Sequence, residues 1–152
     1  MQSRRMQMNV KIKKLYDNAV IPTEGSEKAA GHDLYACLDS EEVAIYPHTT
    51  LLVKTGIAME IPDGYFGGIY ARSGLSSKKV LRPGNCVGVV DSDYRGEIKV
   101  PLHNDSDVPQ SVKNGDRIAQ LIIQPYLNVE FEEADELSNT ERGSGGFGHS
   151  GQ

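Results

Sequence analysis

The chain has 152 residues, of which 38% are hydrophobic and 24% are charged, and its formal net charge is −5. This length fits one globular domain with a modest core. The negative charge argues against general nucleic-acid binding, and no apolar run approaches the roughly 18 residues of a membrane-spanning helix.

The first seven residues, 1–7, contain repeated methionine and no structural pattern. We interpret them as a leader, introduced by cloning or by an alternative start, and leave them out of the fold. Arg4 and Arg5 precede no apolar stretch, so the sequence does not predict a secretory signal. Cys37 and Cys86 form neither a disulfide framework nor a zinc spacing. We expect both to be reduced and buried, as in a cytoplasmic protein.

Short strands separated by turns follow, with almost no helical periodicity. Pro62-Asp63-Gly64 is a strong turn signal, and Ser73 could cap one short helix that runs to Lys78. This pattern predicts an all-β fold, a β-sandwich or jelly roll. The segments that we expect to form strands are 43–45, 51–53, 57–61, 65–70, 98–102, 118–123 and 129–131.

Segment 84–97 is the most informative, and it reads Gly-Asn-Cys-Val-Gly-Val-Val-Asp-Ser-Asp-Tyr-Arg-Gly-Glu. Valine-rich fragments around a polar turn predict a β-hairpin that can hold a ligand against its backbone. Asp91 follows two valines at a strand end, where we expect it to be partly shielded and rigidly held. The alternative to a ligand-binding hairpin is a hairpin whose acidic tip is simply solvated. Asp93 could also act on a ligand, but we prefer a turn-capping role for it.

The composition changes after Glu136. Residues 130–136 contain five acids, and five glycines lie within residues 142–152. We therefore predict a β domain over 8–136 and a flexible, glycine-rich C-terminal arm over 137–152. A disordered linker is the alternative. Because a solvated linker needs neither Arg142 nor Phe147, we favour an arm that orders over a ligand.

Five short segments together carry a resemblance to a known family. Each is weak alone, but their order and spacing resemble the motifs of the homotrimeric dUTPases. The segments are Ala-Gly-His-Asp-Leu-Tyr-Ala at 30–36, Ala-Arg-Ser-Gly-Leu at 71–75, segment 84–97, Gly-Asp-Arg-Ile-Ala-Gln-Leu at 115–121 and Arg-Gly-Ser-Gly-Gly-Phe-Gly at 142–148. The resemblance implies a jelly-roll-like β-sandwich with one small helix, which hydrolyses dUTP to dUMP and pyrophosphate. That activity keeps uracil out of DNA and supplies dUMP for dTMP synthesis.

The resemblance also assigns roles within segment 84–97. Asp91 would activate the attacking water. A side-chain amide and fixed backbone groups would read uracil, and cytosine would leave buried polar groups unpaired. Tyr94 would pack against deoxyribose and leave no space for a 2′-hydroxyl, although a core aromatic is the alternative. The residues implied in binding base and sugar are Asn85, Val87, Val89, Val90, Tyr94 and Lys99.

Phosphate binding is implied elsewhere. Ser73 and the Gly74 backbone at a helix start form an anion site, and Arg72 and Gln120 add contacts. The sequence has no Gly-x-x-x-x-Gly-Lys segment, so a P-loop is excluded. Mg²⁺ would be held mainly by the phosphates and water, with no direct protein ligand. Asp33 would either touch the hydration shell of that ion or organise its neighbours; both roles stay open.

The arm would complete the site. Phe147 would stack on the uracil, and Arg142 would reach the terminal phosphate. In the family each active site contains residues from three subunits. The resemblance therefore implies a homotrimer with shared active sites, in which the arm comes from another chain.

The chain departs from the family pattern in several places. Many members have proline where Ala71 stands and Gly-Ser-Thr-Gly where residues 148–151 read Gly-His-Ser-Gly. Phosphate contacts by Ser150 or His149 are therefore open. A dCTP deaminase and a non-catalytic jelly-roll binding protein are the competing interpretations. A deaminase needs a glutamate placed at the cytosine ring, whereas the acid in the key position here is Asp91.

Overall fold

The structure is a computed structural model that describes residues 8–147. The leader 1–7 and residues 148–152, with His149 and Ser150, lie outside the described residues. The described part contains twelve strands and one helix. Their bounds are β1 Lys11–Lys14, β2 Thr23–Glu24, β3 His32–Tyr35, β4 Glu42–Ile45, β5 Thr50–Lys54, β6 Ile57–Glu60, β7 Tyr65–Tyr70, α1 Ser73–Lys78, β8 Leu81–Pro83, β9 Gly88–Val90, β10 Lys99–Asn104, β11 Gln110–Lys113 and β12 Arg117–Pro125.

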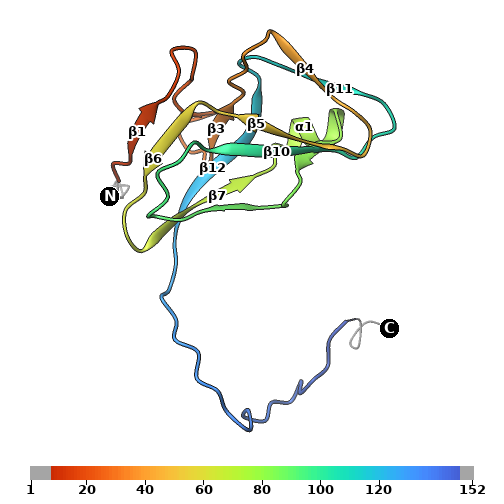
Figure 1. The fold of residues 1–152 in the computed structure, drawn as a ribbon. Helices are drawn as coiled ribbons and strands as arrows, with labels where there is room; N and C mark the ends of the chain where they lie inside the picture. Colours follow the sequence, from red (N-terminus) through yellow and green to blue (C-terminus); the bar gives the residue numbers. More distant parts are fainter. Residues whose placement is uncertain (1–7, 148–152) are drawn as a thin grey trace.

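Antiparallel sheets form the body of the molecule (Figure 1). The largest has the order β2-β3-β12-β7-β9, and a second has the order β5-β10-β8. The pairs β1-β6 and β11-β4 complete the described strands. The prediction of an all-β fold with one short helix is therefore confirmed. Within the described range no helix has the length and apolar character needed to cross a membrane.

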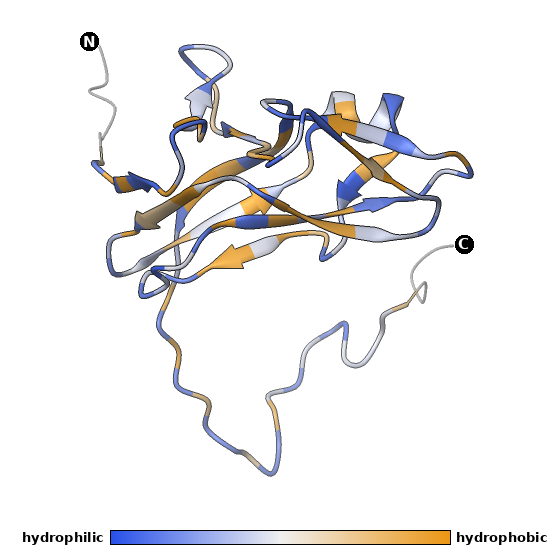
Figure 2. Cartoon of the chain, turned by 45° about the horizontal axis from the view of Figure 1, so that its top comes forward, coloured by the Kyte–Doolittle hydropathy of each residue, from blue (hydrophilic) through white to orange (hydrophobic). Residues whose placement is uncertain are grey.

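The core lies between the sheets and follows the two-residue alternation of the strands. In β10, Val100 and Leu102 are buried, whereas Lys99 and His103 face outward. Figure 2 shows the apolar residues along the strands of the body. The largest fully buried apolar side chains are Leu34, Ile45, Val53, Ile57, Leu81, Val100, Leu102, Val112 and Ile118. One contiguous core of this kind holds the loops that carry the predicted site.

The predicted hairpin at segment 84–97 is wrong. β9 pairs with β7, whereas β10 pairs with β5 and β8. The two strands belong to different sheets, so the segment connects one sheet to the other. The polar turn between them is real: the Tyr94 N–H donates to the carbonyl oxygen of Asp91 at 3.2 Å. The turn therefore lies where two sheets meet, and it joins the edge strand β9 of one sheet to the central strand β10 of the other.

Two local expectations need correction. The helix α1 forms as predicted, but Arg72 is its N-cap and makes no side-chain capping bond, and Ser73 is the first helical residue. Cys37 is buried as expected, whereas Cys86 is exposed, with φ of 62°. Both thiols are free. The turn at residues 62–64 is confirmed, because the Tyr65 N–H donates to the Pro62 carbonyl at 3.2 Å.

The predicted strand at 129–131 is also wrong for the single chain. The last strand, β12, ends at Pro125 and residues 126–147 contain no strand. This segment leaves the body and extends away from it (Figure 1). Val129 and Phe131 are 60% and 93% exposed, because the chain that carries them has no sheet edge beside it.

Candidate active site

A first cleft, which we call the Asp91 cleft, lies between the edge strand β9 and the start of β10. Its volume is about 430 Å³. Six predicted site residues line it together: Asn85, Val89, Val90, Asp91, Tyr94 and Lys99. Val87 is half exposed and does not line this cleft. The sheet-to-sheet connection thus gathers most of the residues expected to bind base and sugar.

Asp91 is the first residue after β9, and it is exposed, not partly shielded as expected. Its backbone position is nevertheless fixed. Val90 on one side is buried in the core, and the Asp91 carbonyl closes the turn to Tyr94. The carboxylate therefore combines an anchored backbone with a position that lines an open cleft, where solvent can reach it as a proton acceptor for water requires.

Tyr94 is held by the residues that follow it. Its hydroxyl donates to the carbonyl oxygen of Glu97 at 3.0 Å. A Cβ atom at position 96 would lie 2.5 Å from that hydroxyl oxygen, so Gly96 is needed for this placement. The Glu97 carboxylate in turn accepts the Gly56 N–H at 3.1 Å. The Tyr94 ring therefore forms a fixed wall of the Asp91 cleft.

Asn85 lies against the backbone of β9. A Cβ atom at position 88 would be 3.3 Å from the Asn85 side-chain nitrogen and 3.2 Å from Cβ of Ile69. Gly88 therefore lets the amide approach the strand closely. The amide and the exposed edge of β9 together offer hydrogen-bonding groups of both kinds to a flat polar ring.

A second cleft, the Arg72 cleft, has a volume of about 380 Å³. Gln120 on β12 pairs across the sheet with Asp33 on β3 and with Tyr70 at the end of β7. This register brings the segments 30–36, 71–75 and 115–121 to one place. Five predicted residues line the cleft: Asp33, Arg72, Ser73, Gly74 and Gln120.

Asp33 is the charged centre of the Arg72 cleft. Its side chain is only 12% exposed, and it accepts a hydrogen bond from Nε of Arg72 at 2.7 Å. Nη1 of Arg117 lies 3.4 Å from its other oxygen. The negative charge of this buried carboxylate is compensated by the two guanidinium groups beside it. This geometry favours the organising role for Asp33 over contact with the water shell of a metal ion.

Gln120 is held in the same cleft by its neighbours. Its side-chain NH₂ donates to the carbonyl oxygen of Ala71 at 2.9 Å. A Cβ atom at position 31 would lie 2.5 Å from the Gln120 side-chain oxygen, so the side chain uses the space that Gly31 leaves open.

The two clefts have no lining residue in common, and none of the described arm residues 137–147 lines either of them. Phe147 is fully exposed, and Nε of Arg142 donates to the carbonyl oxygen of Gly145 within the arm at 2.7 Å. One chain by itself therefore brings together two parts of the predicted site but not the third.

A family model described as dUTPase matches residues 17–151. The chain belongs to the dUTPase family. The deoxyuridine 5′-triphosphate nucleotidohydrolase of Hydrogenobaculum sp. (strain Y04AAS1) is 49% identical over 144 residues, which are 95% of this chain and 99% of the relative. The protein of that name in Helicobacter pylori (strain P12) is 46% identical, over 95% of this chain and 97% of the relative.

Solved dUTPase structures share the fold. The Staphylococcus bacteriophage 80alpha dUTPase with dUpNHpp superposes with a TM-score of 0.86 at 30% identity, covering 96% of this chain and 100% of that chain. A mutant dUTPase from phage phi11 of S. aureus, described with a structural Mg(II) ion, gives a TM-score of 0.74 at 26% identity, over 85% and 98% of the two chains. The family resemblance inferred from the five motifs is confirmed.

The described part of this dUTPase family member contains no cluster of metal-ligating side chains. Across residues 8–147, no three His, Cys, Asp or Glu side chains gather closely enough to hold a metal ion. Asp33 is already paired with two arginines. Within a single chain, the described residues therefore form no direct metal site.

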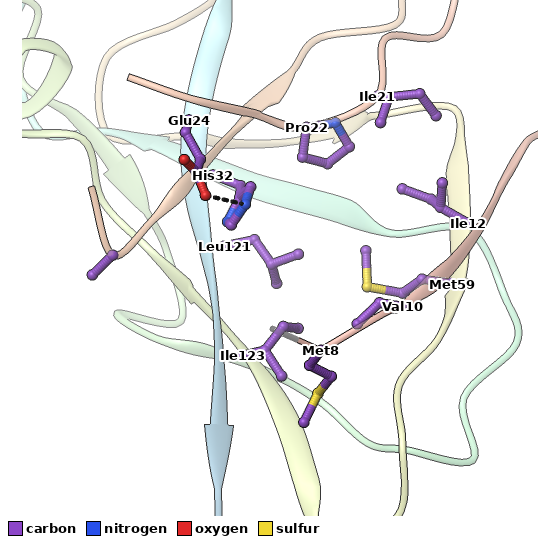
Figure 3. A pocket seen from close by; sticks show the side chains of 11 residues that line it. Met8, Val10, Ile12, Ile21, Pro22, Glu24, His32, Met59, Leu121 and Ile123 are labelled. Atoms are coloured by element: carbon purple, nitrogen blue, oxygen red, sulfur yellow. Dashed lines mark ion pairs between the residues drawn. The ribbon is translucent and has the colours of Figure 1, made fainter. Parts of the chain in front are cut away.

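An apolar groove of about 570 Å³ lies beside the Arg72 cleft, with which it shares the lining residue Ala30, and it has no lining residue in common with the Asp91 cleft. It runs between β1 and β12, and Figure 3 shows Ile12, Leu121 and Ile123 pointing into it. His32 and Glu24, an ion pair at 3.3 Å, close one end (Figure 3). Sequence analysis did not find this groove, because its lining comes from segments far apart in the chain.

Arg117 and Glu97 are the charged residues of the two clefts to which sequence analysis assigned no role. Arg117 stands within the motif-like segment 115–121, and Glu97 ends segment 84–97. Their positions in these segments were the only available signal, since their partners Asp33 and Gly56 are distant in sequence.

Proposed function

We propose that this chain is a dUTP pyrophosphatase that hydrolyses dUTP to dUMP and pyrophosphate in sites shared between subunits. The observation that carries the proposal is the Asp91 cleft, where an anchored carboxylate, a tyrosine ring and the amide of Asn85 face one space. Membership of the dUTPase family supports dUTP as the substrate. The residues of the two clefts have separate roles in binding and hydrolysis.

Asp91 accepts the proton of the attacking water. Hydrolysis of a phosphoanhydride needs an oriented water in line with the leaving group. The carboxylate is exposed to solvent while its backbone is fixed by the turn to Tyr94. Water therefore reaches the carboxylate freely, and the direction from which it attacks is set by the turn.

Uracil is read by fixed groups in the Asp91 cleft. The Asn85 amide and the backbone around Val89 and Lys99 supply donors and acceptors that cannot relax for another base. A wrong base leaves such groups unpaired, which costs far more than a lost apolar contact. Tyr94 packs on the deoxyribose. Its hydroxyl is bound to the Glu97 carbonyl, and its ring fits closely over Gly96, so the ring does not move aside for a 2′-hydroxyl.

The triphosphate lies in the Arg72 cleft. Arg72 donates charge-assisted hydrogen bonds, and Ser73, Gly74 and Gln120 add neutral ones. Mg²⁺ bound to the phosphates would neutralise part of their charge and orient them. In this proposal the ion takes its ligands from the phosphates and from water.

A homotrimer brings the separate parts together. The Asp91 cleft of one subunit faces the Arg72 cleft of a second, and a third supplies the arm. The support is that the two clefts are disjoint and that residues 126–147 leave the body without returning to either. Each subunit then contributes once to each of three sites, as closed cyclic symmetry requires.

The segment 126–131 leads the arm to a neighbouring subunit. Leu127, Val129 and Phe131 are exposed at two-residue spacing, the pattern of a strand with one apolar face. The apolar groove beside β1 has the complementary lining, and β1 pairs only with β6 among the described strands. Docking of this segment in the groove of a neighbour adds a strand at that edge and buries both apolar surfaces.

Pyrophosphate release from dUTP, dCTP, dTTP and UTP tests the proposed function. We expect release from dUTP with Mg²⁺ and at least hundredfold slower release from the other three, since site-built hydrogen bonds reject analogues strongly. Conversion of dCTP to a uracil nucleotide would identify a deaminase instead. Binding of dUTP without turnover would identify a non-catalytic binding protein.

A further inference from the structure

Three charged side chains line the Arg72 cleft: Asp33, Arg72 and Arg117. The other lining residues are uncharged. The three charged side chains contribute one negative and two positive charges, so the net formal charge of the cleft is +1. Removing Arg117 would leave it neutral. The whole chain has a formal net charge of −5, so an anion is attracted only by such local charges.

The two arginines are not equivalent. Arg72 is bound to Asp33 by a short contact of 2.7 Å and is 26% exposed. Arg117 makes a longer contact of 3.4 Å with the second carboxylate oxygen and is 53% exposed. A charged contact at 3.4 Å is well beyond the usual 2.7–2.9 Å of a strong pair. Arg72 is therefore held in place, whereas Arg117 is held loosely and open to solvent.

The start of β12 directs Arg117 toward the cleft. The pairing between β12 and β3 is regular from Ala119 to Leu121, but the register shifts between Arg117 and Ala119. Such an irregularity turns a side chain away from the direction that regular alternation would give it. Arg117 consequently meets Asp33 and lines the cleft with Gln120, three residues along the same strand.

We propose that Arg117 is a further phosphate-binding residue of this cleft. It turns from Asp33 to the phosphate chain when the ligand arrives. Asp33 is not left unpaired by this movement, because its short contact with Arg72 remains. The inference rests on the proposed function, in that it assigns the phosphate chain of dUTP to the Arg72 cleft. It adds the residue that supplies the uncompensated positive charge.

Isothermal titration with inorganic pyrophosphate and with deoxyuridine tests this role. We compare the wild-type protein with Arg117→Gln, with Arg117→Lys and with Lys113→Gln. The last variant makes the same charge change at an exposed residue outside the cleft. Loss of a charge-assisted hydrogen bond weakens binding by about 10–100-fold.

We expect Arg117→Gln to weaken pyrophosphate binding by that factor and to leave deoxyuridine binding unchanged. Arg117→Lys should recover part of the affinity, and Lys113→Gln should match the wild type. The salt dependence of pyrophosphate binding should also decrease in Arg117→Gln. Unchanged pyrophosphate affinity would overturn the proposal. So would an equal loss of pyrophosphate and deoxyuridine binding, which would indicate a structural role. Turnover of dUTP by the wild type, measured alongside, reports on the proposed function separately.

Discussion

Asp91 and Tyr94 are joined through the backbone: the Tyr94 N–H donates to the carbonyl oxygen of Asp91 at 3.2 Å. One turn thereby fixes both the proposed proton acceptor and the ring that we propose to pack on the sugar. The turn lies between two sheets, and β9 and β10 anchor it on either side. Changes in this turn should therefore alter chemistry and specificity more than stability.

Asp91→Asn should lower kcat by about 10²–10⁴-fold, because the amide keeps the shape of the carboxylate but accepts no proton. Binding of a non-hydrolysable dUTP analogue should persist. Asp93→Asn is the matched control, since Asp93 is an exposed acid in the same turn but does not line the cleft. Stopped-flow pyrophosphate release measures both. Turnover by Asp91→Asn at the wild-type rate would remove Asp91 from its role.

Gly96→Ala should relax the choice of sugar. The new Cβ atom would lie 2.5 Å from the Tyr94 hydroxyl oxygen, so the ring must move. We expect the ratio of kcat/KM for dUTP over UTP to fall by about tenfold or more, as the 2′-hydroxyl gains space. Gly25→Ala is the control, because nothing lies within 4 Å of its added carbon. Gly25 lines the Arg72 cleft, so any effect on phosphate binding is shared by dUTP and UTP and leaves their ratio unchanged. An unchanged ratio would show that Tyr94 does not exclude the 2′-hydroxyl.

Much of the fold was predictable from local patterns. Alternation and turn signals predicted the strands β4, β5, β6, β7, β10 and β12, and the serine-rich segment after Arg72 predicted α1. Partners of strands were not predictable, because pairing is decided by segments far apart in sequence. The hairpin at 84–97 was wrong for this reason: the partner of β9 is β7, and the partners of β10 are β5 and β8.

The candidate site also combines features that local sequence predicts with features that depend on distant segments. The motif-like segments carried the residues of both clefts, including Asp91 and Arg72. The exposure of Asp91 and the loose contact of Arg117 with Asp33 depend on three-dimensional neighbours, so no local pattern indicated them. The strand predicted at Val129 and Phe131 has the right alternation but no partner within its own chain.

Phe131→Lys should weaken or abolish the trimer. In the proposed assembly the Phe131 side chain is buried in a neighbour's apolar groove, where an unpaired charge is costly. Glu130→Lys changes charge on the opposite face of the segment and should leave assembly intact. Sedimentation velocity measures the state of both variants. Trimers of equal stability for the two variants would contradict docking of this segment.

The arm should order when nucleotide binds. Its glycines make the ordered state entropically costly, so ligand contacts at Arg142 and Phe147 must compensate. Trypsin should cleave after Arg142 quickly in the free protein and more slowly with a non-hydrolysable dUTP analogue and Mg²⁺. Phe147→Ala should remove the protection, because it removes the stack on the base. Equal cleavage rates with and without the analogue would show that residues 137–152 are a plain linker.

Mixing two inactive variants tests the shared site most directly. Asp91→Asn chains have intact arms, and chains ending at Glu141 have an intact Asp91. Neither variant alone can complete a site. After subunit exchange, verified by native mass spectrometry, we expect roughly a quarter of the sites to combine Asp91 from one chain with an arm from another. dUTP turnover should recover to about that fraction of the wild-type rate. Verified exchange without recovered turnover would show that each chain builds its own site.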